Sequence, residues 1–279
     1  MSYEKLDRPE SLAWIFKAPQ TIAGPPPAGA QDVFWPMADG VRLACRIHET
    51  ATPAAPMILY FHGRSDCVAV CDTIAPGYTA CGLHFVVASY RGYGASEGHP
   101  SVSAMFADGG QILDHLLAWR REAGHTGALV VMGRSLGSAA AIDLCLKRQA
   151  DFKALIIESG LGDTLPLMAH TGIALPEDGM TEADGFGNCQ KIAGIKLPTL
   201  ILHGARDQTV PPSQAEKLQV ASGARNKQFL LVPGADHKTV VAQAGSLYFQ
   251  TIKRFIDGIT GAGIGHTRRR AGKSREQEQ

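Results

Sequence analysis

The stretch Ala128-Leu129-Val130-Val131-Met132-Gly133-Arg134-Ser135-Leu136-Gly137 decides how this chain is interpreted. Its first residues, 128–132, are apolar without a polar break, which is typical of a strand buried on both faces. An alanine- and leucine-rich run, residues 138–146, comes next and favours a helix. A serine in the pattern G-x-S-x-G between a strand and a helix is typical of a nucleophile elbow.

Sterics explain why this turn has glycine at two positions, Gly133 and Gly137. A sharp turn lifts a serine hydroxyl clear of the backbone only if that backbone is strained and the next helix packs close. Side chains two residues to either side of Ser135 would then collide with the surrounding chain. The start of the helix also points free N–H groups toward an oxyanion formed at the serine. We therefore predict that Ser135 is a nucleophile.

The composition narrows the classes of function. The chain has 279 residues, 45% of them hydrophobic, which suits one large α/β domain. With 27 basic and 26 acidic residues, nothing in the net charge argues for binding to nucleic acid or to an anionic membrane. The six cysteines follow no metal-binding spacing, so we expect free thiols and no metal. Chemistry by a serine nucleophile needs no cofactor, and we expect none.

No basic segment precedes a long apolar run at the start of this sequence, and no run reaches the roughly 18 apolar residues of a membrane helix. We therefore expect a cytoplasmic protein without stable membrane insertion. The oligomeric state does not follow from these patterns.

The order of predicted elements indicates the fold. Residues 1–30 are interpreted as a lead-in with a proline-rich linker, 31–260 as the domain, and 261–279 as a disordered tail. An Asp39-Gly40 hairpin joins strands predicted over 33–36 and 41–48. Further strands are predicted over 57–62, 83–89, 154–157, 197–203 and 228–232, with helices over 104–124, 213–221 and 242–258. Such alternation predicts a mostly parallel sheet with helices on both faces.

A serine nucleophile needs a base, and the base needs an acid that orients it. Asp207 follows one buried strand and His237 follows the next, at the sheet edge where α/β proteins keep functional side chains. The chain order Ser135, Asp207, His237 is nucleophile, acid, base. Glu158, which follows the strand after the elbow, is the rival acid. Asp236 is interpreted as a turn residue.

Several motifs together resemble the α/β-hydrolase superfamily of serine hydrolases, across about residues 31–258. Besides the elbow they are His62-Gly63, the loop Tyr90–Gly98, His203-Gly204-x-x-Asp207-x-x-Val210-Pro211, and Gly234-Ala235-Asp236-His237. The resemblance implies an oxyanion hole made by the backbone N–H groups of Arg64 and Leu136. It is strongest with lid-poor branches that contain esterases, acyl-thioesterases and aminopeptidases. We expect the Arg64 side chain to face solvent; in the alternative, an inward guanidinium would favour an acidic substrate group.

This resemblance implies a serine hydrolase that cleaves an ester or thioester of a small to medium acyl substrate through an acyl-enzyme. A serine aminopeptidase or amidase would use the same triad, and a non-catalytic binding protein of this fold is the alternative from another class.

The segment 158–196 is the place where this superfamily inserts a lid, and here it is short. We expect it to form a small cap with apolar residues facing an open pocket, with Met168 and Met180 as wall residues.

Overall fold

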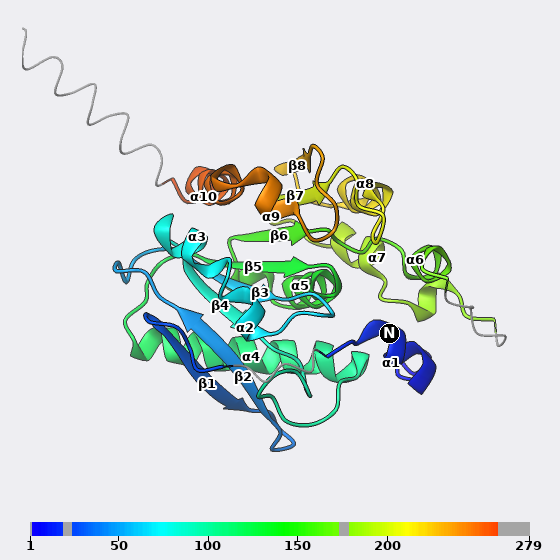
Figure 1. Ribbon diagram of the computed structural model, residues 1–279, viewed down its shortest axis with the longest axis horizontal. Helices are drawn as coiled ribbons and strands as arrows, with labels where there is room; N and C mark the ends of the chain where they lie inside the picture. Colours follow the sequence, from blue (N-terminus) through cyan, green and yellow to red (C-terminus); the bar gives the residue numbers. More distant parts are fainter. Residues whose placement is uncertain (1, 19–23, 173–178, 262–279) are drawn as a thin grey trace, which may run out of the picture.

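The computed structural model describes residues 2–18, 24–172 and 179–261 (Figure 1). These residues build an eight-stranded sheet in the order β1-β2-β4-β3-β5-β6-β7-β8. The strands are β1 (Ala30–Pro36), β2 (Arg42–His48), β3 (Met57–Phe61), β4 (His84–Ala88), β5 (Leu129–Arg134), β6 (Ala154–Glu158), β7 (Thr199–Gly204) and β8 (Lys227–Val232). The pairs β1/β2 and β2/β4 are antiparallel, and all other neighbours are parallel. The predicted fold class is confirmed, including its antiparallel start.

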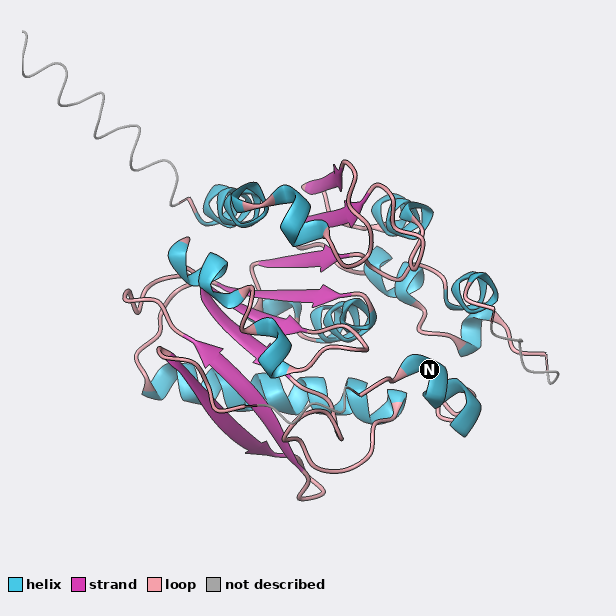
Figure 2. Ribbon diagram, in the orientation of Figure 1, coloured by secondary structure: helices cyan, strands magenta, loops and turns pink. Residues whose placement is uncertain are grey.

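Helices cover both faces of the sheet (Figure 2). Strand β5 shows why: Val131 packs into one hydrophobic cluster, while Val130 and Met132 pack into the other. The first cluster includes residues of α1 (Pro9–Ile15), α4 (Val102–Glu122), α5 (Leu136–Lys147), α6 (Thr164–His170), α7 (Asn188–Ala193) and α8 (Pro212–Ala221). The second includes residues of α2 (Val68–Cys71), α3 (Ala75–Ala80), α9 (Val240–Ala244) and α10 (Ser246–Thr260).

The closing helix differs from the prediction. Residues 242–258 were expected to form one helix, but the chain makes α9 and α10 with Gly245 between them. Gly245 has φ +54° and ψ −136°, a conformation that L-residues avoid, so the helix cannot run through it. Between β3 and β4 the chain forms two short helices, α2 and α3.

The predicted lead-in packs against the domain. Leu6, Ile15 and Phe16 are buried in the first cluster, and the Asp7 carboxylate accepts a hydrogen bond of 2.6 Å from the backbone N–H of Val102, at the start of α4. Residues 19–23 of the expected linker and 262–279 of the expected tail lie outside the described residues. None of the described helices combines the length and apolar content needed to cross a bilayer.

The expected short cap lies between β6 and β7. It contains α6, the 3₁₀ turn η2 (Glu182–Asp184) and then α7, which leads back to the sheet; residues 173–178 lie outside the described part. Figure 1 places α1 at the same end of the molecule as α6. The two chain segments therefore meet above the carboxyl ends of the central parallel strands.

Candidate active site

Ser135 stands on a strained turn between β5 and α5. Its backbone has φ 52° and ψ −119°, which is unusual for a residue with a side chain. A Cβ added to Gly133 would lie 2.1 Å from the carbonyl oxygen of Gly137, and one added to Gly137 would lie 2.0 Å from that of Phe61. Neither glycine has room for a side chain, because the turn packs directly against the backbone of α5 and β3.

Ser135, His237 and Asp207 form one hydrogen-bonded chain. The Nε2 atom of His237 lies 3.1 Å from Ser135 Oγ, and its Nδ1 atom lies 2.7 Å from Asp207 Oδ2. Because an ionised carboxylate only accepts, Nδ1 carries the proton and Nε2 is left to accept the serine proton. The loops after β7 and β8 bring these side chains to the elbow, although they are far apart in the sequence.

The surroundings of the Asp207 carboxylate favour its ionised form. Burial by itself would raise its pKa, but the hydrogen bond and charge of His237 outweigh burial and hold the pKa below its ordinary value. Its other oxygen, Oδ1, accepts hydrogen bonds from the backbone N–H groups of Thr209 (2.9 Å) and Val210 (2.8 Å). The carboxylate therefore has a fixed direction as well as a fixed charge.

The rival acids are engaged elsewhere. Glu158 accepts a hydrogen bond from Arg134 Nε at 3.1 Å and another from the Tyr248 hydroxyl. Asp236 accepts from the backbone N–H groups of Lys238 and Thr239, as expected of a turn residue. His203 donates from Nε2 to the backbone carbonyl of Val210 at 2.8 Å, which agrees with a loop-holding role. Among these acids, Asp207 is the one bound to His237.

Arg134, the second residue of G-x-S-x-G, is a functional candidate that the sequence interpretation missed. Its Nη1 donates to Asp66 Oδ2 and its Nη2 to the backbone carbonyl of His237, both at 2.7 Å, while Nε binds Glu158. Burial alone would lower its pKa, but the charge of Glu158 and then of Asp66 raise the pKa above its usual value. Asp66 in turn accepts from the N–H of Gly63 at 3.2 Å. One half-buried cation thus joins the elbow, the loop after β3 and the His237 loop.

The two expected oxyanion donors lie beside Ser135. Arg64 follows β3 and Leu136 is the first residue of α5; both line the same pocket as Ser135. Neither backbone N–H has an acceptor among the described residues. The carbonyl of Arg64 accepts a hydrogen bond from the Tyr93 hydroxyl at 2.8 Å, and that of His62 accepts one from the Tyr90 hydroxyl at 2.7 Å. The tyrosines of the glycine-rich loop therefore hold this turn in place.

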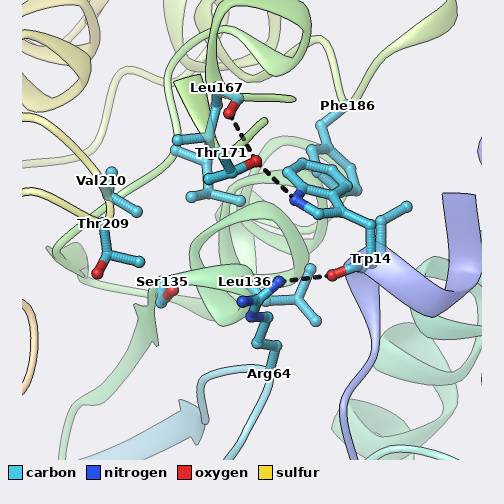
Figure 3. Close-up of a pocket in the computed structure, with 11 residues that line it drawn as sticks. Trp14, Arg64, Ser135, Leu136, Leu167, Thr171, Phe186, Thr209 and Val210 are labelled. Carbon is cyan, nitrogen blue, oxygen red and sulfur yellow. Dashed lines mark hydrogen bonds between the residues drawn. The ribbon is translucent and has the colours of Figure 1, made fainter. Parts of the chain in front are cut away.

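A pocket of about 390 Å³, counting the space at its mouth, opens over Ser135 (Figure 3). The indole Nε1 of Trp14, from α1, donates to Thr171 Oγ1 at the end of α6, at 2.9 Å. Two segments distant in the sequence thereby close one wall. The other lining residues are mostly apolar: Ile15, Leu136, Leu161, Leu167, Phe186, Thr209 and Val210.

Two expectations about this pocket are wrong. Met168 and Met180 do not line it; they are buried in the first hydrophobic cluster. Leu167 and Thr171, four residues apart, face the pocket from one side of α6, so Met168 faces the core. The Arg64 side chain does not turn to solvent, because its Nη1 donates to the backbone carbonyl of Trp14 at 2.7 Å and the residue lines the pocket.

Among the described residues, one group with metal-ligand chemistry lies at the other end of the sheet. Atoms of Glu49, His84 and His125 lie within 4.8 Å of one another. However, His84 Nδ1 accepts from the N–H of Thr50 (3.2 Å) and its Nε2 donates to the carbonyl of Thr52 (3.0 Å). Both ring nitrogens are therefore occupied, and hydrogen bonding accounts for the group without a metal. All six cysteines are unpaired thiols, as expected.

The sheet order, the strained elbow and the hydrogen-bonded serine, histidine and aspartate define a hydrolase of the α/β class. The sequence profile of a family described as serine aminopeptidase, S33, matches residues 52–173. The chain is 32% identical over 206 residues to the Schizosaccharomyces pombe protein bem46, covering 72% of this chain and 67% of that protein. It is 30% identical over 246 residues to the Arabidopsis thaliana alpha/beta hydrolase domain-containing protein WAV2, covering 81% and 78%. The chain therefore belongs to the α/β-hydrolase superfamily.

Solved structures show the same fold at lower identity. An esterase of Pyrococcus furiosus superposes with a TM-score of 0.68 at 14% identity, covering 88% of this chain and 98% of the esterase. A monoglyceride lipase of Saccharomyces cerevisiae, solved with a substrate analogue, has a TM-score of 0.64 at 16% identity, covering 88% and 97%.

Proposed function

We propose that this protein hydrolyses a carboxylic ester or thioester of a small to medium acyl substrate through an acyl-enzyme intermediate. The observation that carries this proposal is the chain of hydrogen bonds from Ser135 through His237 to Asp207 at the pocket that opens over the serine. The esterase and lipase with the same fold support the class of reaction.

The hydrogen bonds between Ser135, His237 and Asp207 define a path for each proton that moves during the reaction. Ser135 Oγ attacks the acyl carbonyl while His237 Nε2 takes its proton, and Asp207 stabilises the imidazolium through Nδ1. The imidazolium then protonates the departing alcohol or thiol, which leaves the acyl group on Ser135. Water, deprotonated by Nε2, attacks this acyl-enzyme and releases the acid, and the proton returns to Oγ.

The backbone N–H groups of Arg64 and Leu136 are assigned to the oxyanion. Their positions are set before charge develops, by the packing of the elbow and by the tyrosine hydrogen bonds behind the loop. Each donor of this kind lowers the barrier by about 3 kcal/mol. Oxyanion binding uses only backbone N–H groups, so for this step the identity of the residues at positions 64 and 136 matters only through its effect on the shape of the backbone.

The pocket size favours short or medium acyl groups. The space over Ser135 is about 390 Å³, and part of it is open solvent at the mouth, so the enclosed volume is smaller than this figure. Each buried CH₂ contributes about 0.8 kcal/mol, and this gain stops where the pocket wall ends. We expect kcat/KM to peak before long-chain esters and to show no jump when substrate forms micelles.

A serine aminopeptidase is the second candidate, favoured by the description of the matching family profile. Such an enzyme needs a carboxylate near the serine to hold the substrate's amino group. The charged residue that lines the pocket in the described structure is Arg64, a cation. The lining therefore supports ester or thioester cleavage over aminopeptidase activity.

One assay panel tests these alternatives. p-Nitrophenyl esters of increasing length, acyl thioesters and aminoacyl anilides are compared, with a fluorophosphonate probe to label the nucleophile. We expect ester or thioester cleavage and labelling at Ser135. Faster cleavage of anilides would favour the aminopeptidase, and failure of Ser135 to react with the probe would favour a binding protein. A kcat/KM that still rises at palmitoyl esters would contradict the size argument.

A further inference from the structure

The guanidinium of Arg64 lies in the pocket between Ser135 and Trp14 (Figure 3). One of its nitrogens, Nη1, donates to the backbone carbonyl of Trp14 at 2.7 Å. The opposite edge, formed by Nε–H and Nη2–H, has no acceptor among the described residues. Two parallel donors are therefore free on a side chain that shares the pocket with the nucleophile.

No acidic side chain of the described structure forms an ion pair with this cation. The nearby acids are engaged: Asp66 and Glu158 bind Arg134, and Asp207 binds His237. The rest of the lining is apolar apart from hydroxyl groups. A cation in such surroundings interacts strongly with any anion that enters, because little else competes for its donors.

We propose that Arg64 forms a carboxylate subsite and that the preferred substrate is an ester or thioester of a dicarboxylic acid, with one carboxyl group free. This inference rests on the proposed hydrolysis. The Nε/Nη2 edge matches the two oxygens of a carboxylate, so a bidentate contact forms while Nη1 keeps its bond to Trp14. The small pocket keeps that carboxylate within a short chain of the scissile carbonyl.

The test compares two esters matched in acyl length, mono-p-nitrophenyl adipate and p-nitrophenyl hexanoate. Wild-type protein should prefer the anionic ester in kcat/KM. Arg64→Met should lower the ratio of anionic to neutral kcat/KM by about tenfold to a hundredfold, mainly through KM. Arg64→Lys should retain part of the preference, because it keeps the charge but loses the paired donors.

A matched control separates this subsite from the general charge of the region. Arg206 is an exposed cation beside Asp207 that does not line the pocket. Arg206→Met removes the same charge and should leave the ratio close to that of the wild type. An equal fall in both methionine variants would overturn the subsite, since a diffuse field would then account for the preference.

The outcomes distinguish this inference from the proposed function. Hydrolysis of hexanoate with an unchanged ratio in Arg64→Met would refute the subsite while the hydrolase stands. If neither ester is cleaved, calorimetric titration of both esters into Ser135→Ala and into the double variant Ser135→Ala/Arg64→Met measures the same ratio as binding constants. Tighter binding of the adipate ester that depends on Arg64 would support the subsite even where hydrolysis fails, and equal binding would refute it.

Discussion

Two walls of one pocket are built in different ways. The reactive wall is Ser135, which lines the pocket, together with the residues linked to it, His237, Asp207 and Arg134; hydrogen bonds of 2.7–3.1 Å tie these residues in place. The cap wall consists of Trp14, Leu161, Leu167, Thr171 and Phe186, which come from α1 and from the segment between β6 and α7. It is held by apolar packing and by the bond from Trp14 to Thr171.

This difference shows that the fold separates the residues positioned for proton transfer from the residues that shape the pocket for the substrate. Proton transfer requires the reacting atoms to be positioned within about 0.5 Å, which short polar contacts and close backbone packing provide. Substrate choice requires only shape and charge, which apolar segments provide with fewer directional bonds. Arg64 belongs to both walls, since its backbone faces the elbow and its side chain binds α1.

The largest effect should come from breaking the reactive wall at its centre. Ser135→Ala should lower ester turnover by about 10⁴–10⁶-fold, because the triad acts as a unit. The fold should persist, since alanine carries the same backbone strain as serine. Steady-state kinetics and a thermal melt check both statements; turnover near that of the wild type would place the nucleophile elsewhere.

The next effect separates the bound acid from its rival. Asp207→Asn should lower kcat by about 10⁴-fold, because an amide presents the wrong partner to His237 Nδ1. Glu158→Gln keeps the shape and should lower kcat far less. Both variants must be compared as folded proteins by circular dichroism, and the reverse ranking would assign the acid to Glu158.

Arg134→Met should weaken the support behind the reactive wall. This substitution leaves Glu158 buried without its cation, so the free energy of unfolding should fall by about 3–5 kcal/mol. A displaced His237 loop should lower kcat/KM by about 10²-fold. Arg134→Lys keeps the charge but cannot reach three acceptors, so its stability and kcat/KM should lie between those of the wild type and those of Arg134→Met. Urea titration measures the stability.

The control for Arg134 is Arg148→Met, which removes a more exposed cation paired with Asp114 and Asp151. Arg148→Met should lower the free energy of unfolding by less than about 1 kcal/mol. Equal losses in the two methionine variants would contradict the special role of Arg134.

Acid should destabilise the protein through buried histidines. Burial lowers the pKa of His62 and His203 behind the reactive wall, and of His48 and His84 elsewhere. The unfolded chain then binds protons first as the pH falls below about 6.5, so stability decreases by up to about 1.4 kcal/mol per pH unit for each histidine. Urea midpoints between neutral and mildly acidic pH should show this slope. His203→Asn should flatten it, and an unchanged slope would exclude His203 as a source.

The smallest effect should come from the cap wall. Thr171→Val removes the acceptor of the Trp14 hydrogen bond while keeping the volume, and should raise KM by about twofold to tenfold with little change in kcat. Trp14→Ala should act in the same direction and more strongly, because it also removes the ring from the wall. A fall in kcat with constant KM would show that the two walls are coupled.

Much of this protein follows from local sequence. Five apolar residues before Gly133, the small residues after Ser135, and a polar loop after each later strand indicate an α/β sheet with its functional side chains at one edge. These features act through chain-local sterics and through periodicity, so they can be recognised without knowing which segments touch. The order Ser135, Asp207, His237 belongs to the same kind of information.

The tertiary structure decided the rest. That Trp14 lines the pocket, that Met168 does not, and that Arg64 points inward depend on which segments pack together across long sequence separations. Arg134 shows the same limit, since its partners Asp66, Glu158 and the carbonyl of His237 come from three other loops and strands. The direction of a side chain is set by the free energy of all its neighbours, and those neighbours are assembled only when the sheet closes the chain on itself. The sequence by itself therefore predicted the candidate catalytic residues, while the packing of distant segments determined which side chains line the pocket beside them.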